Sequence, residues 1–335
     1  MSGKIQNTPI EYKDVKPEET EEILKYFQAN TQEGFVRVGP KGYLYLKGYL
    51  QLAENVYNLA LRPDDVWVIT FPKSGTTVMQ ELVWMVANGC DYKKSKEIPL
   101  INRFSFLESG IFRNNKKSAE LEKSRSTDKE AIPKVNVVEQ AQSPRFFKSH
   151  LPLSLLPPAL LDTCKVVHVA RDPRDVAVSY YHFYKHFIPM GYTGDFKQFW
   201  NLFINNQIDE TPFFENVKES WDQRHHPNML FIFYEDLLKD LPSVVKRVAD
   251  FLGKSMTEGQ ISSLCEHLSF DNFKKNNSVN GHILRNFNIT TLDHILVRKG
   301  KAGGWTEYFD EEMTQQASRW MEVNLQRTDL KFPGA

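Results

Sequence analysis

Residues 73–77 bring one ammonium group, three hydroxyl groups and a glycine into a single short loop. The sequence there reads Lys-Ser-Gly-Thr-Thr, between an apolar run that ends at Phe71 and an apolar helical pattern over 78–86. Unpaired backbone amides at the start of a helix attract anions, and glycine lets the backbone approach a ligand closely. The loop therefore predicts a cradle for a phosphate-like anion. The alternative is a capped helix with a solvated lysine.

The order of residues in this loop separates it from a Walker A motif. That motif requires the order Gly-x-x-x-x-Gly-Lys-[Ser/Thr], whereas here Lys73 precedes Gly75, the only glycine of the loop. The pattern thus argues against an ATP-dependent kinase, although Asp236 could imitate a magnesium-binding carboxylate. A test of whether activity depends on a metal would distinguish a kinase from a protein with a different anion cradle.

Two further basic groups could bind anions. Arg171 follows an apolar run at 165–170, and the next residues, Asp172 and Pro173, suit the start of a helix. A guanidinium fork at that point suits a phosphate, or it only forms a salt bridge with Asp175. The second group is the basic, glycine-rich segment 298–304, which is either a flap over a phosphate or an ordinary surface loop.

A candidate general base follows a short predicted strand at 145–148. His150 stands two residues after Lys148, and an imidazole can accept a proton from a hydroxyl group near neutral pH. The chain has nine histidines, and a lone histidine is more often structural. Its place at the end of a strand favours the catalytic reading.

The elements that must position these residues form an α/β pattern. The runs at 66–71, 165–170 and 229–234 are continuously apolar, as expected for strands buried on both faces of a parallel sheet that helices cover. Ligands of such sheets gather beyond the carboxyl ends of the strands, where the loops above lie. A hairpin at 35–46, a helix at 50–61 and a short helix near 23–27 precede this pattern.

Composition limits the class of protein. The 335 residues include 42 Lys plus Arg and 42 Asp plus Glu, and a net charge of zero argues against a surface built for nucleic acid. Three widely spaced cysteines predict neither a disulfide framework nor a thiolate zinc site. No apolar run near the start suits a signal peptide, and none is long enough for a bilayer. We expect a cytoplasmic protein without a membrane association.

The domain organisation is predicted to be a single domain over residues 1–335. It begins with a polar N-terminal extension at 1–34. The segment 108–143 is charged but contains scattered apolar residues, which favours a lid over an apolar ligand. The alternative is a plain surface insertion.

With these residues in view, the chain resembles the PAPS-dependent cytosolic sulfotransferases, where PAPS is 3′-phosphoadenosine-5′-phosphosulfate. The matching segments are Phe-Pro-Lys-Ser-Gly-Thr-Thr at 71–77, Lys-Ser-His-Leu-Pro at 148–152, Ala-Arg-Asp-Pro-Arg-Asp at 170–175, Tyr-Glu-Asp-Leu at 234–237 and Arg-Lys-Gly-Lys-Ala-Gly at 298–303. They occur in the family's order. The segment before Lys148 and the C-terminal end look similar to the insect branch, which includes a retinol dehydratase.

The resemblance implies a P-loop-like strand-loop-helix for the phosphosulfate, His150 as general base, and Lys73 and Lys148 at the transferring group, with no metal. It implies that the nucleotide contacts Lys73, Ser74, Gly75, Thr76, Thr77, Val78, Arg171, Ser179, Tyr234, Leu268, Ser269, Phe270, Leu296, Val297, Arg298, Lys299 and Gly300. The acceptor is expected to be a small, hydroxylated, apolar molecule such as a phenol, a steroid or a retinoid-like alcohol. Its expected contacts are Lys148, Ser149, His150, Phe104, Phe106, Phe112 and Tyr192, with Phe183 and Phe187 as further aromatic candidates.

Two alternative functions remain, and the sequence departs from the family's pattern at two places. Dehydration of an alcohol through a transient sulfate ester is the alternative within the family, and a non-catalytic nucleotide-binding protein is the alternative outside it. Val78 stands where the family usually has a tryptophan that stacks on adenine. The segment 305–310 lacks the family's Thr-Val dimer pattern, so we do not expect the C-terminal dimer.

Overall fold

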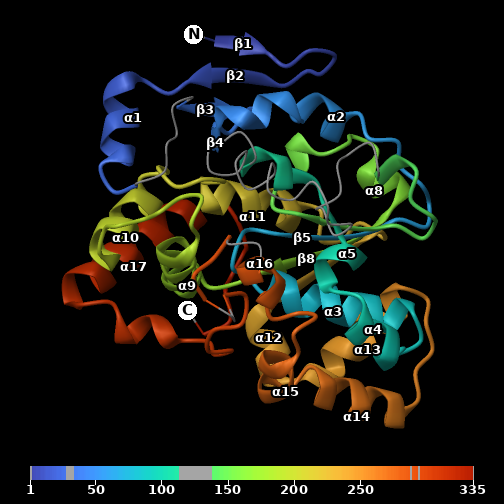
Figure 1. Cartoon of the computed structure of the whole chain (residues 1–335). Coiled ribbons are helices and arrows are strands. Elements are labelled where there is room, and N and C mark those ends of the chain that lie inside the picture. Colours follow the sequence, from blue (N-terminus) through green and yellow to red (C-terminus); the bar gives the residue numbers. More distant parts are fainter. Residues whose placement is uncertain (1, 28–33, 113–137, 287–288, 293–294, 335) are drawn as a thin grey trace.

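The computed structural model describes residues 2–27, 34–112, 138–286, 289–292 and 295–334, with only the backbone at 110–112. At its centre lies a parallel sheet in the order β6-β7-β5-β8-β9 (Figure 1). Its strands are β5 (Val66–Thr70), β6 (Ser105–Phe106), β7 (Phe146–Ser149), β8 (Lys165–Ala170) and β9 (Met229–Phe233). The predicted α/β fold with a central parallel sheet is confirmed.

The side of the sheet to which successive strands are added changes at β5. After β5 the chain adds β6 and β7 on one side, and then β8 and β9 on the other. Such a reversal point is where open α/β sheets bind ligands. The register aligns Thr70 with Val169 and Ile69 with Ser149, so the ends of β5, β7 and β8 lie level with one another.

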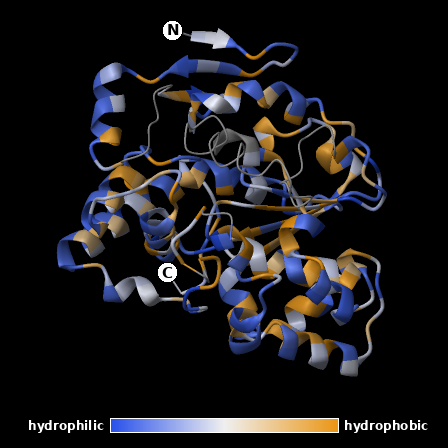
Figure 2. Cartoon of the chain, viewed as in Figure 1, coloured by the Kyte–Doolittle hydropathy of each residue, from blue (hydrophilic) through white to orange (hydrophobic). Residues whose placement is uncertain are grey.

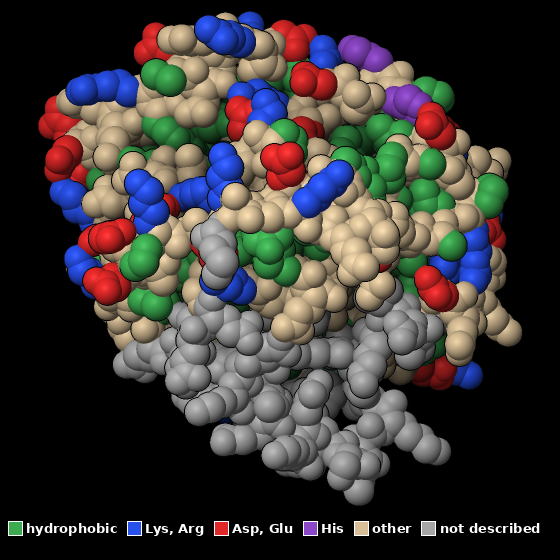
Figure 3. All heavy atoms as spheres, turned by 90° about the horizontal axis from the view of Figure 1, so that it is seen from above, with side chains coloured by type: hydrophobic (Ala, Val, Ile, Leu, Met, Phe, Trp, Pro, Cys, Tyr) green, Lys and Arg blue, Asp and Glu red, His purple; other side chains and the backbone are tan. Residues whose placement is uncertain are grey.

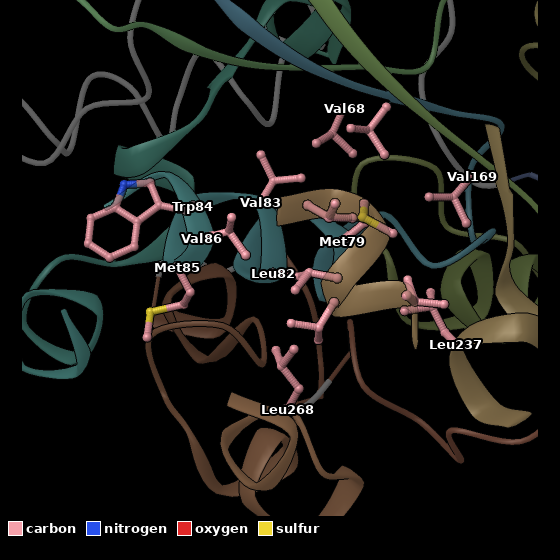
Figure 4. Close-up of a cluster of buried hydrophobic side chains, with 14 of the residues drawn as sticks. Val68, Met79, Leu82, Val83, Trp84, Met85, Val86, Val169, Leu237 and Leu268 are labelled. Carbon is pink, nitrogen blue, oxygen red and sulfur yellow. The ribbon is translucent and has the colours of Figure 1, made fainter. Parts of the chain in front are cut away.

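The helix after β5 covers one face of the sheet. Helix α3 (Thr76–Ala87) buries Met79, Leu82 and Val83. Figure 4 shows these side chains in a cluster with Val68 of β5 and Leu237 of α12. The neighbouring helices are α12 (Tyr234–Lys239), α13 (Leu241–Phe251), α14 (Glu258–His267) and α15 (Phe270–Lys275).

An aromatic core covers part of the other face, beside a separate cluster that contains Trp67 and Ile69 of β5. The aromatic core contains Phe71, Trp200, Phe203 and Phe213, all fully buried, and Figure 2 shows apolar residues concentrated in the central strands beside it. Asp172 caps the first of its helices as predicted, because its side chain accepts from the Arg174 amide. The helices are α9 (Pro173–His186), α10 (Phe196–Ile204), α11 (Phe213–Asp222) and α17 (Glu311–Leu325).

A second, antiparallel sheet lies beside the first and includes the predicted hairpin. Its order is β1-β2-β3-β4, with strands β1 (Ser2–Lys4), β2 (Glu11–Asp14), β3 (Phe35–Val38) and β4 (Tyr43–Leu46). The two N-terminal strands were not expected, since their short polar sequences carry no alternating pattern. The early helix, α1, spans Pro17–Leu24 rather than 23–27. The helix expected at 50–61 is shorter: the 3₁₀ helix η1 (Lys47–Gln51) and α2 (Ala53–Tyr57) stand there.

The remaining elements are short connections around the central sheet. They are α4 (Tyr92–Glu97), α5 (Leu100–Arg103), η2 (Leu107–Phe112), η3 (Leu153–Leu155), α8 (Leu160–Thr163), α16 (His282–Asn286) and η4 (Gly304–Glu307). Most of the segment proposed as a lid, residues 113–137, lies outside the described residues. None of the helices described has both the length and the apolar character needed to cross a bilayer. On the face seen in Figure 3, acidic and basic side chains are interspersed.

Candidate active site

A cavity of about 1060 Å³ lies at the carboxyl ends of β5, β7 and β8. It brings together most of the residues that the sequence singled out, from seven separate segments of the chain. Those on its wall are Lys73, Gly75, Thr76, Thr77, Val78, Phe104, Phe106, Lys148, His150, Arg171, Ser179, Phe183, Phe187, Tyr234, Leu268, Ser269, Phe270, Leu296, Val297, Arg298, Lys299 and Gly300.

Three expected residues are not on this wall, and the side chain of a fourth is not described. Tyr192 is buried in the aromatic core against Phe27 and Phe199, so its expected acceptor contact is not supported. The Ser149 hydroxyl points to Glu108, and the Ser74 hydroxyl is fully buried behind the loop. The side chain of Phe112 lies outside the described residues.

The loop after β5 has the backbone of a tight anion cradle. Lys73 has a φ of 66° and Gly75 a φ of 106°, and both lie in the left-handed region. A Cβ atom at Gly75 would lie 2.5 Å from the Tyr234 ring, so only glycine fits there. Thr76 begins helix α3, and its hydroxyl lies 2.7 Å from that of Thr70.

Two lysines reach the cavity from adjacent strands. The Lys73 Nζ atom lies 4.7 Å from the centre of the Phe183 ring, and the Lys148 Nζ atom lies 4.1 Å from that of Phe106. Burial, together with the charges of Lys148 and two arginines, lowers the pKa of Lys73 to about 7. Burial lowers the pKa of Lys148 to about 8, although Glu108 and Glu210 raise it. Such crowded cations favour an anionic ligand.

Arg171 has both roles that the sequence allowed. Its guanidinium lies 3.7 Å from the carboxylate of Asp175, and it donates to the carbonyl oxygens of Lys73 and Lys301. It also lines the cavity, over the ring of Tyr234 at 4.5 Å. Its Nε atom is buried without a partner among the described residues, so a donor remains for a ligand.

The basic segment at 298–304 folds back over the cavity. Asp175 holds it there, because its carboxylate accepts from the amides of Gly303 and Trp305 at 2.7 and 2.9 Å. Gly300 has a φ of 61°, and a Cβ atom on it would lie 2.3 Å from the ring of Phe270. The packing therefore favours the predicted flap over an ordinary surface loop.

His150 is held with one nitrogen bonded to the protein. Its Nδ1 atom lies 2.8 Å from the carbonyl oxygen of Thr70, so Nδ1 donates its proton and Nε2 keeps a lone pair. Burial and the charge of Lys148 hold its pKa well below the usual value. The imidazole is therefore neutral at pH 7 and can accept a proton from a hydroxyl group.

These residues fit a nucleotide with two anionic groups. The cations lie in two groups. One group comes from the β5 loop and β7, and the other consists of Arg171 and the 298–301 segment, so two separate anions can be bound. The unpartnered Nε of Arg171 and the crowded lysines supply the donors. Phe270, Tyr234 and Val78 provide apolar surface between them. The described residues contain no group of three potential metal ligands.

The rest of the wall suits an apolar acceptor, with one exception that the sequence did not reveal. Phe104, Phe106, Phe183 and Phe187 line it beside His150. Glu210 also lines it, although it is buried and accepts from the Tyr180 hydroxyl at 3.1 Å. A φ of 71° at Glu210 is the kind of signal that only a structure can show.

Comparisons with known proteins agree with this site. Residues 63–329 match the model of the sulfotransferase domain. A luciferin sulfotransferase of Photinus pyralis is 37% identical over 69% of this chain and 62% of that protein, and the sulfotransferase 1E1 of Homo sapiens is 30% identical over 87% and 94%. A crystal structure of retinol dehydratase with androsterone and the inactive cofactor PAP is 42% identical, with a TM-score of 0.90, and covers 98% of this chain and 99% of that one.

Proposed function

The chain belongs to the sulfotransferase family, and from this premise we propose that it sulfates the hydroxyl group of a small apolar acceptor, with His150 as general base. PAPS, when bound, supplies the sulfuryl group and leaves as the bisphosphate PAP. The observation that carries the proposal is the neutral imidazole of His150 beside two half-buried lysines in one cavity.

Each of these side chains has a distinct task in this proposal. Lys73, in the anion cradle, stabilises negative charge on the departing phosphate. Lys148 stabilises charge on the oxygens of the group in transfer, because a loose transition state spreads charge over them. His150 takes the proton of the acceptor hydroxyl on Nε2, while Thr70 keeps the proton on Nδ1.

Nucleotide binding is assigned to the loops around these side chains. Thr76 and Thr77 would bind the 5′ side together with the amides that begin α3. Arg171, Ser179 and Arg298 would bind the 3′-phosphate. Since Val78 is too small to stack on adenine, Phe270 is left as the aromatic surface for that ring.

The experiment is a screen of phenols, steroids and retinoids with radiolabelled PAPS. We expect label in an organic-soluble product for at least one hydroxylated apolar acceptor. PAP binding without product from any member of a broad panel would contradict the proposal and favour a non-catalytic nucleotide-binding protein.

A second candidate is dehydration of an alcohol through a transient sulfate ester. Two structures of retinol dehydratase, one with retinol and PAP, are each 42% identical to this chain over at least 97% of its length. Mass spectrometry of the retinol reaction separates the cases. A sulfate ester supports transfer alone, whereas loss of water from retinol that requires PAPS supports dehydration.

A further inference from the structure

Glu108 makes three hydrogen bonds to the turn that carries the catalytic side chains. Its Oε1 atom accepts from the Ser149 hydroxyl and the His150 amide, both at 2.6 Å, and from the Leu151 amide at 3.0 Å. The side chain of Glu108 is 1% exposed. Its other oxygen, Oε2, is buried without a hydrogen-bond partner among the described residues. Buried carboxylates are costly unless they are hydrogen-bonded, so the three bonds to Oε1 tie η2 to the end of β7.

The other hydrogen bonds of His150 involve its carbonyl and its ring, so among the described residues only Glu108 binds its backbone amide. The amide nitrogen of Asn216 donates to the His150 carbonyl at 3.1 Å, and Thr70 binds the imidazole. Glu108 supplies the partner for the His150 amide. Because the position of an imidazole follows from the backbone that carries it, loss of this bond would let Nε2 move relative to the acceptor.

Glu108 also acts on the neighbouring lysine through its charge. When ionised, it raises the pKa of Lys148, as does Glu210, against the burial that lowers it. Burial raises the pKa of Glu108 itself, and its hydrogen bonds from Ser149, His150 and Leu151 lower it. Tyr45, Tyr49 and Glu210 are the other titratable groups in electrostatic contact with Glu108.

We propose that Glu108 is a positioning residue for sulfuryl transfer, which orients His150 through the backbone of its turn. This inference rests on the function proposed above. Glu108 does not line the cavity, so it acts through His150 and Lys148 without touching either substrate.

The chain offers a control on helix α11, where the half-buried Glu219 binds the segment that follows His150. Glu219 is another carboxylate with three hydrogen bonds, from the Ser154 amide at 2.8 Å, the Ser154 hydroxyl at 2.9 Å and the Tyr43 hydroxyl at 2.7 Å. It binds the chain a few residues after His150 but contacts no residue to which we assign a catalytic task. Glu219→Gln therefore tests what the loss of a comparable clamp does to folding alone.

The experiment compares Glu108→Gln, Ser149→Ala and Glu219→Gln with the wild-type protein and its best acceptor. Glutamine keeps one acceptor oxygen, but it removes the charge and places an NH2 group where Oε2 is buried without a partner among the described residues. We therefore expect Glu108→Gln to displace the turn and to lower kcat roughly 10- to 100-fold, the range for a misplaced catalytic group, with KM and the Kd of PAP within about twofold. Ser149→Ala removes one bond and keeps the charge, so its kcat should fall less. Glu219→Gln should keep its kcat, even where its Tm falls.

The pH profile separates positioning from a structural role. Without the charge of Glu108, Lys148 loses its proton at lower pH. The alkaline limb of the pH profile of kcat should therefore move to lower pH in Glu108→Gln. In Glu219→Gln it should stay in place. An unchanged kcat and profile in Glu108→Gln would overturn the inference. So would equal losses of kcat and Tm in both glutamine variants. A wild-type protein without any sulfated product would instead contradict the proposed function.

Discussion

The Nδ1 atom of His150 lies 2.8 Å from the carbonyl oxygen of Thr70, the last residue of the neighbouring strand β5. A carbonyl oxygen only accepts hydrogen bonds, so this contact fixes the proton on Nδ1. The strand that leads into the anion cradle thereby also sets the tautomer of the base. Donor binding and proton transfer are linked through one residue.

The role of His150 is tested by its replacement with alanine. We expect His150→Ala to lower kcat about 10²- to 10⁴-fold, the usual contribution of a general base. The Kd of PAP, measured by calorimetry, should change little because the imidazole faces the acceptor. His225→Ala, at an exposed site, is the control. Near wild-type turnover of a phenol by His150→Ala would contradict the assignment.

The lowered pKa of Lys73 predicts that the protein takes up protons when it binds the nucleotide. Its pKa is about 7 in the free protein, so it is largely neutral at pH 8, and a bound anion favours its charged form. Affinity for PAP should therefore fall as pH rises above about 7. Calorimetry at pH 8 in two buffers of different ionisation enthalpy measures the uptake.

The control for this uptake is Lys73→Arg, since arginine stays charged. This variant should take up fewer protons, and the remainder should come from Lys148, whose pKa is about 8. A binding enthalpy that is independent of the buffer in the wild-type protein would refute the prediction.

The 3′-phosphate should contribute strongly to nucleotide affinity. Its proposed partners, Arg171 and Arg298, would be left without an anion by an analogue that lacks this group. A hydrogen bond to a charged group contributes about 1.5–3 kcal/mol, so we expect the analogue to bind roughly 100-fold more weakly than PAP. Ser179→Ala should reduce this difference. Equal affinities for PAP and the analogue would show that the 3′-phosphate is not recognised there.

The C-terminal dimer of the family is not expected. Trp305 lies over the guanidinium of Arg174 at 4.0 Å, and Phe309 packs on Trp200 with ring centres 4.8 Å apart. These contacts hold the segment 305–310 within its own chain. Sedimentation equilibrium should show no dimer that depends on this segment, and a dimer disrupted by substitutions there would prove the prediction wrong.

Loops that follow strands were predictable from the sequence, because their chemistry is local. An apolar run, a polar turn and a helix start stand together in the sequence at Lys73 and Arg171, and His150 follows a short predicted strand. The parallel sheet then places such turns at one edge. Strands β5, β7, β8 and β9 and the helices after 75 and 172 follow from the same patterns, whereas the two-residue strand β6 was not predicted.

Long-range contacts and core membership were not predictable in this way. Glu108 meets the turn at His150 across 42 positions of sequence, and nothing near either residue marks the pair. Tyr192 belongs to the aromatic core, which uses the same residue types as an apolar pocket. Residue type alone could not separate the two.

The strand order has a consequence for how this enzyme can diverge. The loops of β5 and β8 carry the groups assigned to the nucleotide, whereas α5 and the connection into β6 contribute Leu100, Phe104 and Phe106 to the apolar wall. This part of the acceptor wall comes from a different connection than Lys73 and Arg171, although Phe183 and Phe187 of the same wall follow β8. Substitutions at the outer strand can therefore alter acceptor preference while the donor site stays intact, so the fold allows new substrates to evolve on a constant chemistry.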